Sequence, residues 1–139
     1  MPEKNLETLL SSMNPLLHSE EFVFCSVREH ELRSLDITPL CLFREDEAVS
    51  LILEKHAADR ASLKHTGVWS LITCKINSDL MAVGFLAAMS NILADAGIAV
   101  NAVSAYFHDH LFVPSHQANE ALELLRQLSD QRPGISNCP

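Results

Sequence analysis

The clearest pattern of hydrophobic and polar positions lies in residues 68–114. An apolar, β-branched run over 68–76 has the length of a buried strand, and the polar residues Asn77-Ser78-Asp79 follow it. A strand over 98–107, a turn at His108-Asp109 and a short strand as far as Pro114 come later. Between them, apolar side chains recur at the 3.6-residue spacing of a helix closed by Gly97, namely Phe85, Leu86, Met89, Ile92, Leu93 and Ala96. The stretch predicts a strand–helix–strand–hairpin unit.

The residues on either side predict three further helices and three strands. Asn5 is a candidate N-cap for a first helix that Asn14-Pro15 ends, and its apolar positions are Leu6, Leu9, Leu10 and Met13. Residues 28–37 are polar and predict a loop. Strands are predicted over 21–27, 38–43 and 48–54, and a short helix over 56–64 closed by Gly67. After the stretch, Ser115 is the predicted N-cap of a last helix that ends near Arg132-Pro133-Gly134.

The two halves of the chain echo each other. Phe43, a charged turn, an apolar strand and the helix from His56 parallel Phe107, a polar turn, an apolar strand and the helix near His116. Such self-similarity indicates a duplication. We predict an N-terminal unit over 1–66, whose first helix is missing, a C-terminal unit over 67–132 and a tail over 133–139.

Several of these residues resemble a known family. The run Asp79-Leu80-Met81-Ala82-Val83-Gly84 resembles the loop and first helix of the ACT domain, although many ACT sequences carry Pro-Gly where this one has Val83-Gly84. Residues 92–98 resemble that family's exit from the helix into its second strand. Residues 78–114, with Tyr106-Phe107-His108-Asp109-His110, are more closely similar to a small bacterial group of stand-alone, tandem ACT-like proteins of unassigned function. That group is also similar to cytosolic arginine sensors of animals.

The resemblance implies an α+β fold of the ferredoxin-like type, βαββαβ, with antiparallel sheets and helices on one face. Neither half has a fourth strand after its last helix, so we expect two interleaved ACT-like units, as in the aspartokinase regulatory region. Strand 68–76 would complete the first sheet and strand 22–27 the second, which leaves no exposed edge where a strand is missing. The resemblance also implies an allosteric, regulatory homodimer that binds a small amino acid or a similar metabolite.

The elbow over 77–84 is the predicted ligand site. A helix N-terminus presents unpaired N–H groups and a partial positive charge, which suit a carboxylate. Asp79 would accept an ammonium group or simply cap the helix. By resemblance, Val100 and Asn101 contribute from a paired unit, and the alternative for Asn101 is a solvent-facing strand position. The elbow residues proposed to bind the ligand are Asn77, Ser78, Asp79, Leu80, Met81, Ala82, Val83 and Gly84.

The sequence offers a metal site as an alternative and no catalytic constellation. His108 and His110 are two residues apart and share a face of a strand, so with Asp109 they form a candidate zinc or iron site. The alternative is a polar β-turn in which Asp109 bonds to nearby backbone. No serine stands in a nucleophile motif, and no glycine loop for phosphate is present. We therefore expect no cofactor and no enzymatic activity.

Composition narrows the class of protein further. The net charge of −8, without a basic cluster, disfavours binding to nucleic acid. The longest apolar run is too short for a membrane span and the start MPEKNLE is unlike a signal peptide, so we expect a soluble cytoplasmic protein that binds no membrane. Cys25, Cys41 and Cys74 lie in apolar runs and are expected to be structural thiols, whereas Cys138 lies in the tail.

Overall fold

A computed structural model describes residues 1–131, which fall into two compact units. Unit 1 contains Met1–His18 together with the chain from Ser70 onward, and unit 2 contains Ser19–Trp69. These units are defined by packing, whereas the predicted division into 1–66 and 67–132 concerns repeats along the sequence and stays a prediction. The predicted tail and Cys138 lie outside the described residues.

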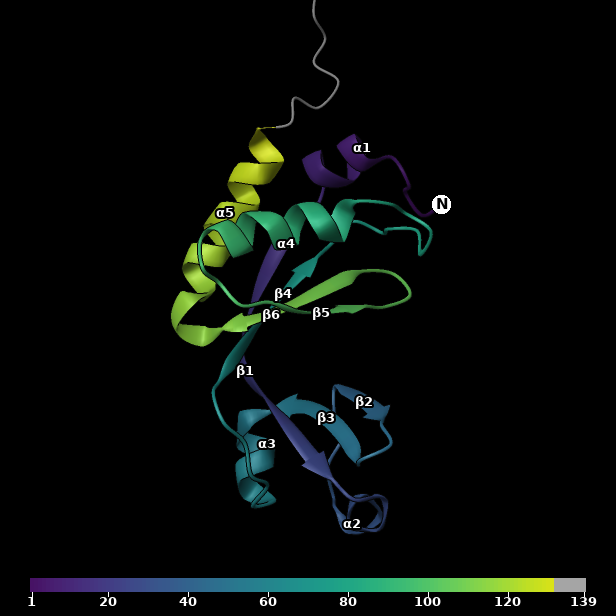
Figure 1. Ribbon diagram of the computed structural model, residues 1–139, viewed down its shortest axis with the longest axis vertical. Helices are drawn as coiled ribbons and strands as arrows, with labels where there is room; N and C mark the ends of the chain where they lie inside the picture. The colour runs from purple at the N-terminus through teal and green to yellow at the C-terminus, as the bar shows by residue number, and fades with distance from the viewer. Residues whose placement is uncertain (132–139) are drawn as a thin grey trace, which may run out of the picture. The chain divides into compact units, whose positions relative to one another are not determined.

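Unit 1 is a sheet with helices on one face. Its strands follow the order β1-β4-β6-β5, in which the first residues of β1 provide one strand. Its three helices lie on the same side of these strands (Figure 1). The elements are α1 (Leu6–Ser11), the start of β1 (Pro15–Val27), β4 (Trp69–Cys74), α4 (Phe85–Asp95), β5 (Asn101–Ser104), β6 (Asp109–Pro114), the 3₁₀ turn η1 (Ser115–Gln117) and α5 (Ala118–Asp130).

The core of unit 1 lies between its helices and its sheet. Alternate residues of β4 and β6, Ile72 and Cys74 with Leu111 and Val113, point to the helix side, as expected for strands with one face buried. They meet helix residues that include Leu9, Leu10, Phe85, Met89, Leu93, Ala121 and Leu125. Burial raises the pKa of the Cys74 thiol to about 12, so this cysteine is inert, and Cys25 and Cys41 are free thiols as well.

Unit 2 repeats the same kind of hairpin on a smaller scale. Its strands follow the order β2-β3-β1 and pair antiparallel, with Cys25 opposite Leu51 and Cys41 opposite Ile52. Residues of β1 and β3 and Ala58 of α3 form its core. The elements are the remainder of β1, α2 (Glu29–Ser34), β2 (Cys41–Arg44), β3 (Val49–Glu54) and α3 (Lys55–Arg60).

The predicted α+β class, antiparallel pairing and α1 are confirmed. The Asn5 side chain accepts a hydrogen bond of 3.0 Å from the Thr8 N–H, so it caps α1 as the sequence indicates. Gly97 takes the predicted left-handed conformation after α4, with φ of 72°. The strand predicted over 21–27 is longer, because it starts at Pro15.

Three local predictions are wrong. Residues 28–37 are not wholly a loop, because Glu29–Ser34 form α2, so the helix predicted to be missing from the first half is present as a short one. Ser115 does not cap the last helix; it lies in η1, and its hydroxyl accepts a hydrogen bond from Ser70. The β5–β6 turn is closed by a bond of 3.0 Å from the Ala105 N–H to the His108 carbonyl, so Asp109 starts β6 rather than turning the chain.

Of the glycines within residues 1–131, Gly84 is expected to tolerate a side chain least. Its φ is 95°, which disfavours any L-residue, and a Cβ there would meet Leu6 Cδ2 of α1 at 3.2 Å. Gly97 has a similar φ, and a Cβ at that position would meet nothing within 4 Å, so it is the matched control for backbone strain alone. We expect Gly97→Ala to cost about 1 kcal/mol of unfolding free energy and Gly84→Ala measurably more. Equal costs in urea denaturation would contradict the proposed contact with Leu6.

Candidate ligand site

The elbow and the β5–β6 turn together form a cleft in unit 1. Its volume is about 350 Å³, at the lower end of the range for small-molecule sites. Four consecutive elbow residues and two aromatic residues of the turn line it, together with one residue near the chain start. The lining residues are Asn77, Ser78, Asp79, Leu80, Tyr106, Phe107 and Pro2.

Two segments distant in sequence hold the elbow in place. The Glu3 N–H donates to the Asn77 carbonyl at 2.8 Å, and the Asp79 N–H donates to the Glu3 carbonyl at 2.9 Å, as in a pair of parallel strands. On the other side, the Ser78 N–H donates to the Phe107 carbonyl at 3.1 Å. We call residues 1–4 the strap, because they run beside the elbow as an extra strand segment.

Asp79 closes a turn inside the elbow. Its Oδ1 accepts a bond of 2.7 Å from the Met81 N–H, and its carbonyl accepts one of 3.0 Å from the Ala82 N–H. The N-cap position of α4 is Gly84, which has no side chain to offer, so Asp79 does not cap this helix as one alternative held. The second oxygen, Oδ2, lies 3.9 Å from Lys4 Nζ of the strap.

The hydrogen bonds of the elbow use much of the predicted carboxylate cradle. The N–H groups of Ser78, Asp79, Met81 and Ala82 all donate to acceptors of the protein itself. These four N–H groups therefore already have partners within the protein. A ligand there would be recognised by side-chain charge and apolar contact more than by backbone N–H groups.

A buried carboxylate fastens the elbow to the hairpin. Asp109, at the start of β6, is only 8% exposed, and its two oxygens accept hydrogen bonds from Ser78 Oγ at 3.0 Å and Ser104 Oγ at 2.5 Å. Both oxygens thus have hydroxyl donors, which a buried charge requires. Ser78 is itself 7% exposed, so its role is to anchor the elbow.

The structure does not assemble a metal site from residues 108–110. Asp109 bonds to the two serines, whereas His110 Nδ1 is hydrogen-bonded to Thr73 Oγ1 at 2.9 Å, and that hydroxyl also pairs with His18 Nε2 at 2.8 Å. Across residues 1–131, no group of three histidine, cysteine or carboxylate side chains has the arrangement to hold a metal ion. The described geometry therefore lends no support to the metal alternative for these three residues.

Val100 and Asn101 do not line the cleft. Asn101 is exposed at the start of β5, opposite Phe112 of β6, and Val100 packs partly buried against the core of unit 1. Their predicted role toward a ligand therefore concerns a second copy of the chain, and it stays a prediction.

Sequence reasoning missed the aromatic wall of the cleft. Tyr106 is 75% exposed, and its ring meets that of Phe107 edge to face with centroids 4.9 Å apart. Two adjacent aromatic residues in a four-residue turn were the available signal, because a turn tip rarely needs them for packing. Pro2 gave no signal, since its place in the cleft depends on the pairing of the strap.

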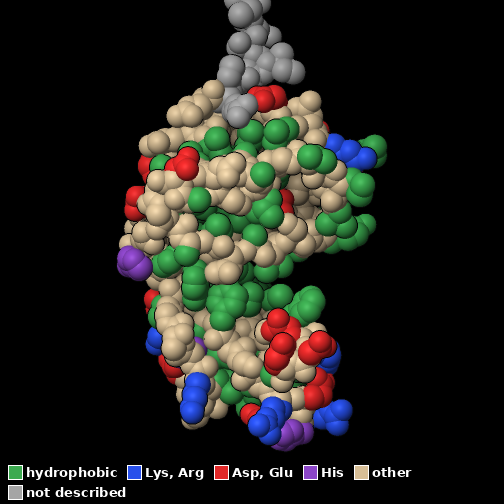
Figure 2. All heavy atoms as spheres, in the orientation of Figure 1, with side chains coloured by type: hydrophobic (Ala, Val, Ile, Leu, Met, Phe, Trp, Pro, Cys, Tyr) green, Lys and Arg blue, Asp and Glu red, His purple; other side chains and the backbone are tan. Residues whose placement is uncertain are grey.

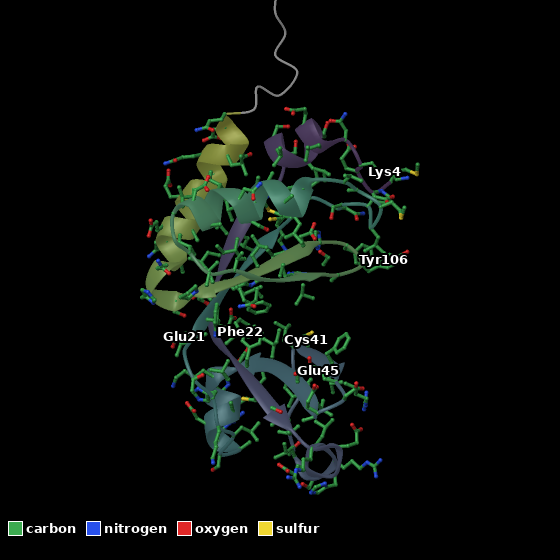
Figure 3. The ribbon with its side chains drawn as sticks, viewed as in Figure 1. Lys4, Glu21, Phe22, Cys41, Glu45 and Tyr106 are labelled. Atoms are coloured by element: carbon green, nitrogen blue, oxygen red, sulfur yellow. The ribbon has the colours of Figure 1, made fainter. Side chains whose placement is uncertain are left out.

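The elbow also exposes large apolar side chains. Large exposed hydrophobic side chains of the elbow are Leu80, Met81 and Val83, the last of them 82% exposed. Figure 2 shows hydrophobic side chains gathered along this edge of unit 1, the edge where Figure 3 labels Lys4 and Tyr106. Such a rim commonly marks a surface that another molecule covers.

Two family models described as ACT domain match the chain, one over residues 1–70 and the other over residues 67–127. The chain belongs to the ACT domain family. The predicted resemblance is confirmed, and so is the ferredoxin-like class, because ACT domains have that fold. ACT domains are regulatory rather than catalytic, so membership supports a ligand-binding regulatory module.

Solved structures agree with this assignment. A Vibrio cholerae protein of unknown function, described as a possible transport protein, is 40% identical; the match covers 91% of this chain and 97% of that one, with a TM-score of 0.78. An Agrobacterium tumefaciens protein shares the fold at 17% identity; the match covers 83% of this chain and 87% of that one, with a TM-score of 0.63. The ligand-free regulatory subunit of Thermus thermophilus aspartate kinase also shares it at 10% identity; the match covers 85% of this chain and 97% of that one, with a TM-score of 0.63. No curated protein matches. None of the helices described is long and apolar enough to cross a membrane.

Removal of the Asp109 carboxylate is expected to destabilise unit 1. Asp109→Ala leaves the buried Ser78 hydroxyl without its acceptor, which typically costs about 1–3 kcal/mol, and it also removes the acceptor of the exposed Ser104 hydroxyl. Asp95→Ala, on an exposed position of α4, is the control for loss of one negative charge. Urea denaturation measures both variants. A cost for Asp109→Ala no larger than that of the control would show that the two hydrogen bonds contribute little.

His110 is expected to make the stability of unit 1 sensitive to acid. Burial lowers its pKa first, the neighbouring His108, His18 and Lys75 lower it further, and Asp109 acts in the opposite direction. Because the folded pKa lies below the ordinary value of about 6.5, the folded state binds fewer protons than the unfolded state. The contribution of neutral His110 to the unfolding free energy is therefore fully present above its ordinary pKa of about 6.5. It is lost as the pH falls through the lower pKa of the folded state.

The measurement is the midpoint of thermal unfolding between pH 7.5 and 5. His110→Gln is expected to flatten the decline seen in the wild-type protein, whereas His116→Gln, at an exposed position, is expected to leave it unchanged. Parallel declines in all three proteins would exclude His110 as the cause.

Proposed function

We propose that this protein is a sensor module that binds a small amino acid in the cleft of unit 1 and thereby shifts the activity of a partner. The observation that carries the proposal is the cleft itself. It is built from the elbow of an ACT domain, has the volume for one small metabolite, and combines one carboxylate with an apolar and aromatic wall.

The lining residues suit an amino acid. The Asp79 Oδ2 atom offers a negative charge for an ammonium group, and the exposed Asn77 side chain offers further hydrogen bonds. Leu80, Tyr106 and Phe107 offer apolar contact for a side chain. No group in this arrangement serves as a nucleophile, so the protein acts by binding, without a cofactor and without catalysis.

The module works as a homodimer in the cytoplasm. The elbow residues of one copy face Val100 and Asn101 of the second, which explains why these two residues lie outside the cleft of their own chain. The exposed Leu80, Met81 and Val83 support this arrangement, because a second copy would bury them. Ligand binding then stabilises one geometry of the dimer and transmits the signal.

A second function is supported by the same exposed side chains. Leu80, Met81 and Val83 are exposed on the elbow, so the elbow can equally serve as a ligand-free contact for a protein partner. The two functions differ in one measurable property, the response of the protein to free amino acids.

Thermal unfolding in the presence of each of the twenty amino acids at millimolar concentration tests the proposal. A ligand at a hundred times its dissociation constant adds about 2.7 kcal/mol of stability, which raises the midpoint by several degrees. We expect one chemical class to do so, and we expect Asp79→Ala and Asn101→Ala to abolish the shift. Asn91→Ala, an exposed position on α4, is the control. No shift with any amino acid would favour the ligand-free contact instead.

A further inference from the structure

The strap brings one lysine side chain close to Asp79, a residue that lines the cleft. Pro2 lines the cleft, and Glu3 pairs with the elbow through two backbone hydrogen bonds. The Glu3 carboxylate accepts bonds from the N–H groups of Lys4 at 2.9 Å and Asn5 at 2.7 Å, and Asn5 caps α1. The backbone of Lys4 is thus fixed on both sides, and only its side chain is free to move.

The Lys4 ammonium and the Asp79 carboxylate form an incomplete pair. Their closest atoms, Nζ and Oδ2, are 3.9 Å apart, whereas a hydrogen-bonded pair of these groups would measure about 2.7–2.9 Å. The Lys4 side chain is 65% exposed and that of Asp79 21% exposed. An open pair of this kind contributes little to stability, and each group keeps bonding capacity for a third partner. Figure 3 shows Lys4 at the same edge of unit 1 as Tyr106 of the cleft.

We propose that Lys4 and Asp79 together select a zwitterionic α-amino acid, with Lys4 binding the ligand carboxylate and Asp79 its ammonium group. This inference rests on the proposed function and names the charged groups that its ligand must carry. An α-amino acid bears its two opposite charges on one carbon, so it requires two opposite protein charges side by side. The elbow supplies only the negative one, and the strap supplies the other.

Ligands with a single charge fit this arrangement less well. A simple amine would have to compete with the Lys4 ammonium for Asp79, and a simple carboxylate would have to compete with Asp79 for Lys4. A zwitterion contacts both groups and leaves neither charge without a partner. The elbow N–H groups of Ser78, Asp79, Met81 and Ala82 donate within the protein, which increases the need for a side-chain cation toward the carboxylate.

The test compares wild-type protein with the variants Lys4→Gln, Asp79→Asn and the control Lys64→Gln, an exposed lysine of unit 2. Calorimetric titration uses three probes: the amino acid that most raises the unfolding midpoint, the amine that lacks its carboxylate, and the acid that lacks its amino group. Because Lys4 is exposed, its replacement is not expected to affect folding, and the unfolding midpoint of each variant without ligand checks this.

We expect Lys4→Gln to lower the affinity for the amino acid by about tenfold or more and to leave the affinity for the amine unchanged or raised. Asp79→Asn should lower the affinity for the amino acid, and Lys64→Gln should leave the affinity for all three probes unchanged. If Lys4→Gln binds the amino acid as well as wild type or more tightly, Lys4 is a bystander or a competitor, and the inference fails while the proposed function stands. If the wild-type protein responds to none of the twenty amino acids, the proposed function fails, and this inference fails with it.

Discussion

The geometry of the candidate site depends on one buried carboxylate. Asp109 holds Ser78 of the elbow and Ser104 of β5 at the same time, so three stretches of chain are fixed by two hydrogen bonds. A buried charge is tolerated only when its oxygens are hydrogen-bonded, and therefore the elbow has little freedom to leave the hairpin. The Ser78 N–H, which donates to the Phe107 carbonyl, reinforces the same contact. The cleft between elbow and turn is for this reason preformed, which reduces the entropy that a ligand must overcome.

The same rigidity changes how the site can recognise a ligand. A loop before a helix is usually read as a set of free N–H donors for an anion. Here Glu3 of the strap, Phe107 and Asp79 itself accept hydrogen bonds from four of those donors, and the polar side chains near the elbow include the carboxylate of Asp79, the Asn77 amide and the Lys4 ammonium. The aromatic residues Tyr106 and Phe107 line the same cleft as the elbow segment that bears the charge. Specificity should therefore lie in a few side chains, and single substitutions can test it.

Patterns within short segments predicted most of the fold, and contacts between distant segments are what the sequence could not show. The period of α4, the cap of α1 and the glycine after α4 depend on neighbours a few residues apart, so the sequence predicts them. The sequence does not predict the strap, because pairing of Glu3 with the elbow joins residues more than seventy positions apart. The apparent echo of Phe43 and Phe107 also misled: Phe43 lies within β2, opposite Ser50, whereas Phe107 lies in the turn after β5. The two phenylalanines therefore occupy different structural positions in the two hairpins.

The strand registers give a better comparison of the two hairpins and show how the surroundings of their turns differ. Both turns close with the same 3.0 Å bond, from Glu45 N–H to Ala48 carbonyl in unit 2 and from Ala105 N–H to His108 carbonyl in unit 1. Arg44 pairs across its hairpin with Val49, as Ser104 pairs with Asp109.

Where unit 1 has a buried carboxylate, unit 2 therefore has a valine, and Arg44 instead reaches the exposed Glu29 of α2 at 2.9 Å. An exposed ion pair contributes little to stability and does not fix a loop, whereas a buried hydrogen-bonded carboxylate does. The turn of unit 2 also carries the charged residues Glu45, Asp46 and Glu47 where unit 1 carries Tyr106 and Phe107, so an apolar ligand group would have nothing to contact there. The two hairpins thus keep the same backbone connection, while the residues that make a binding cleft are present in unit 1.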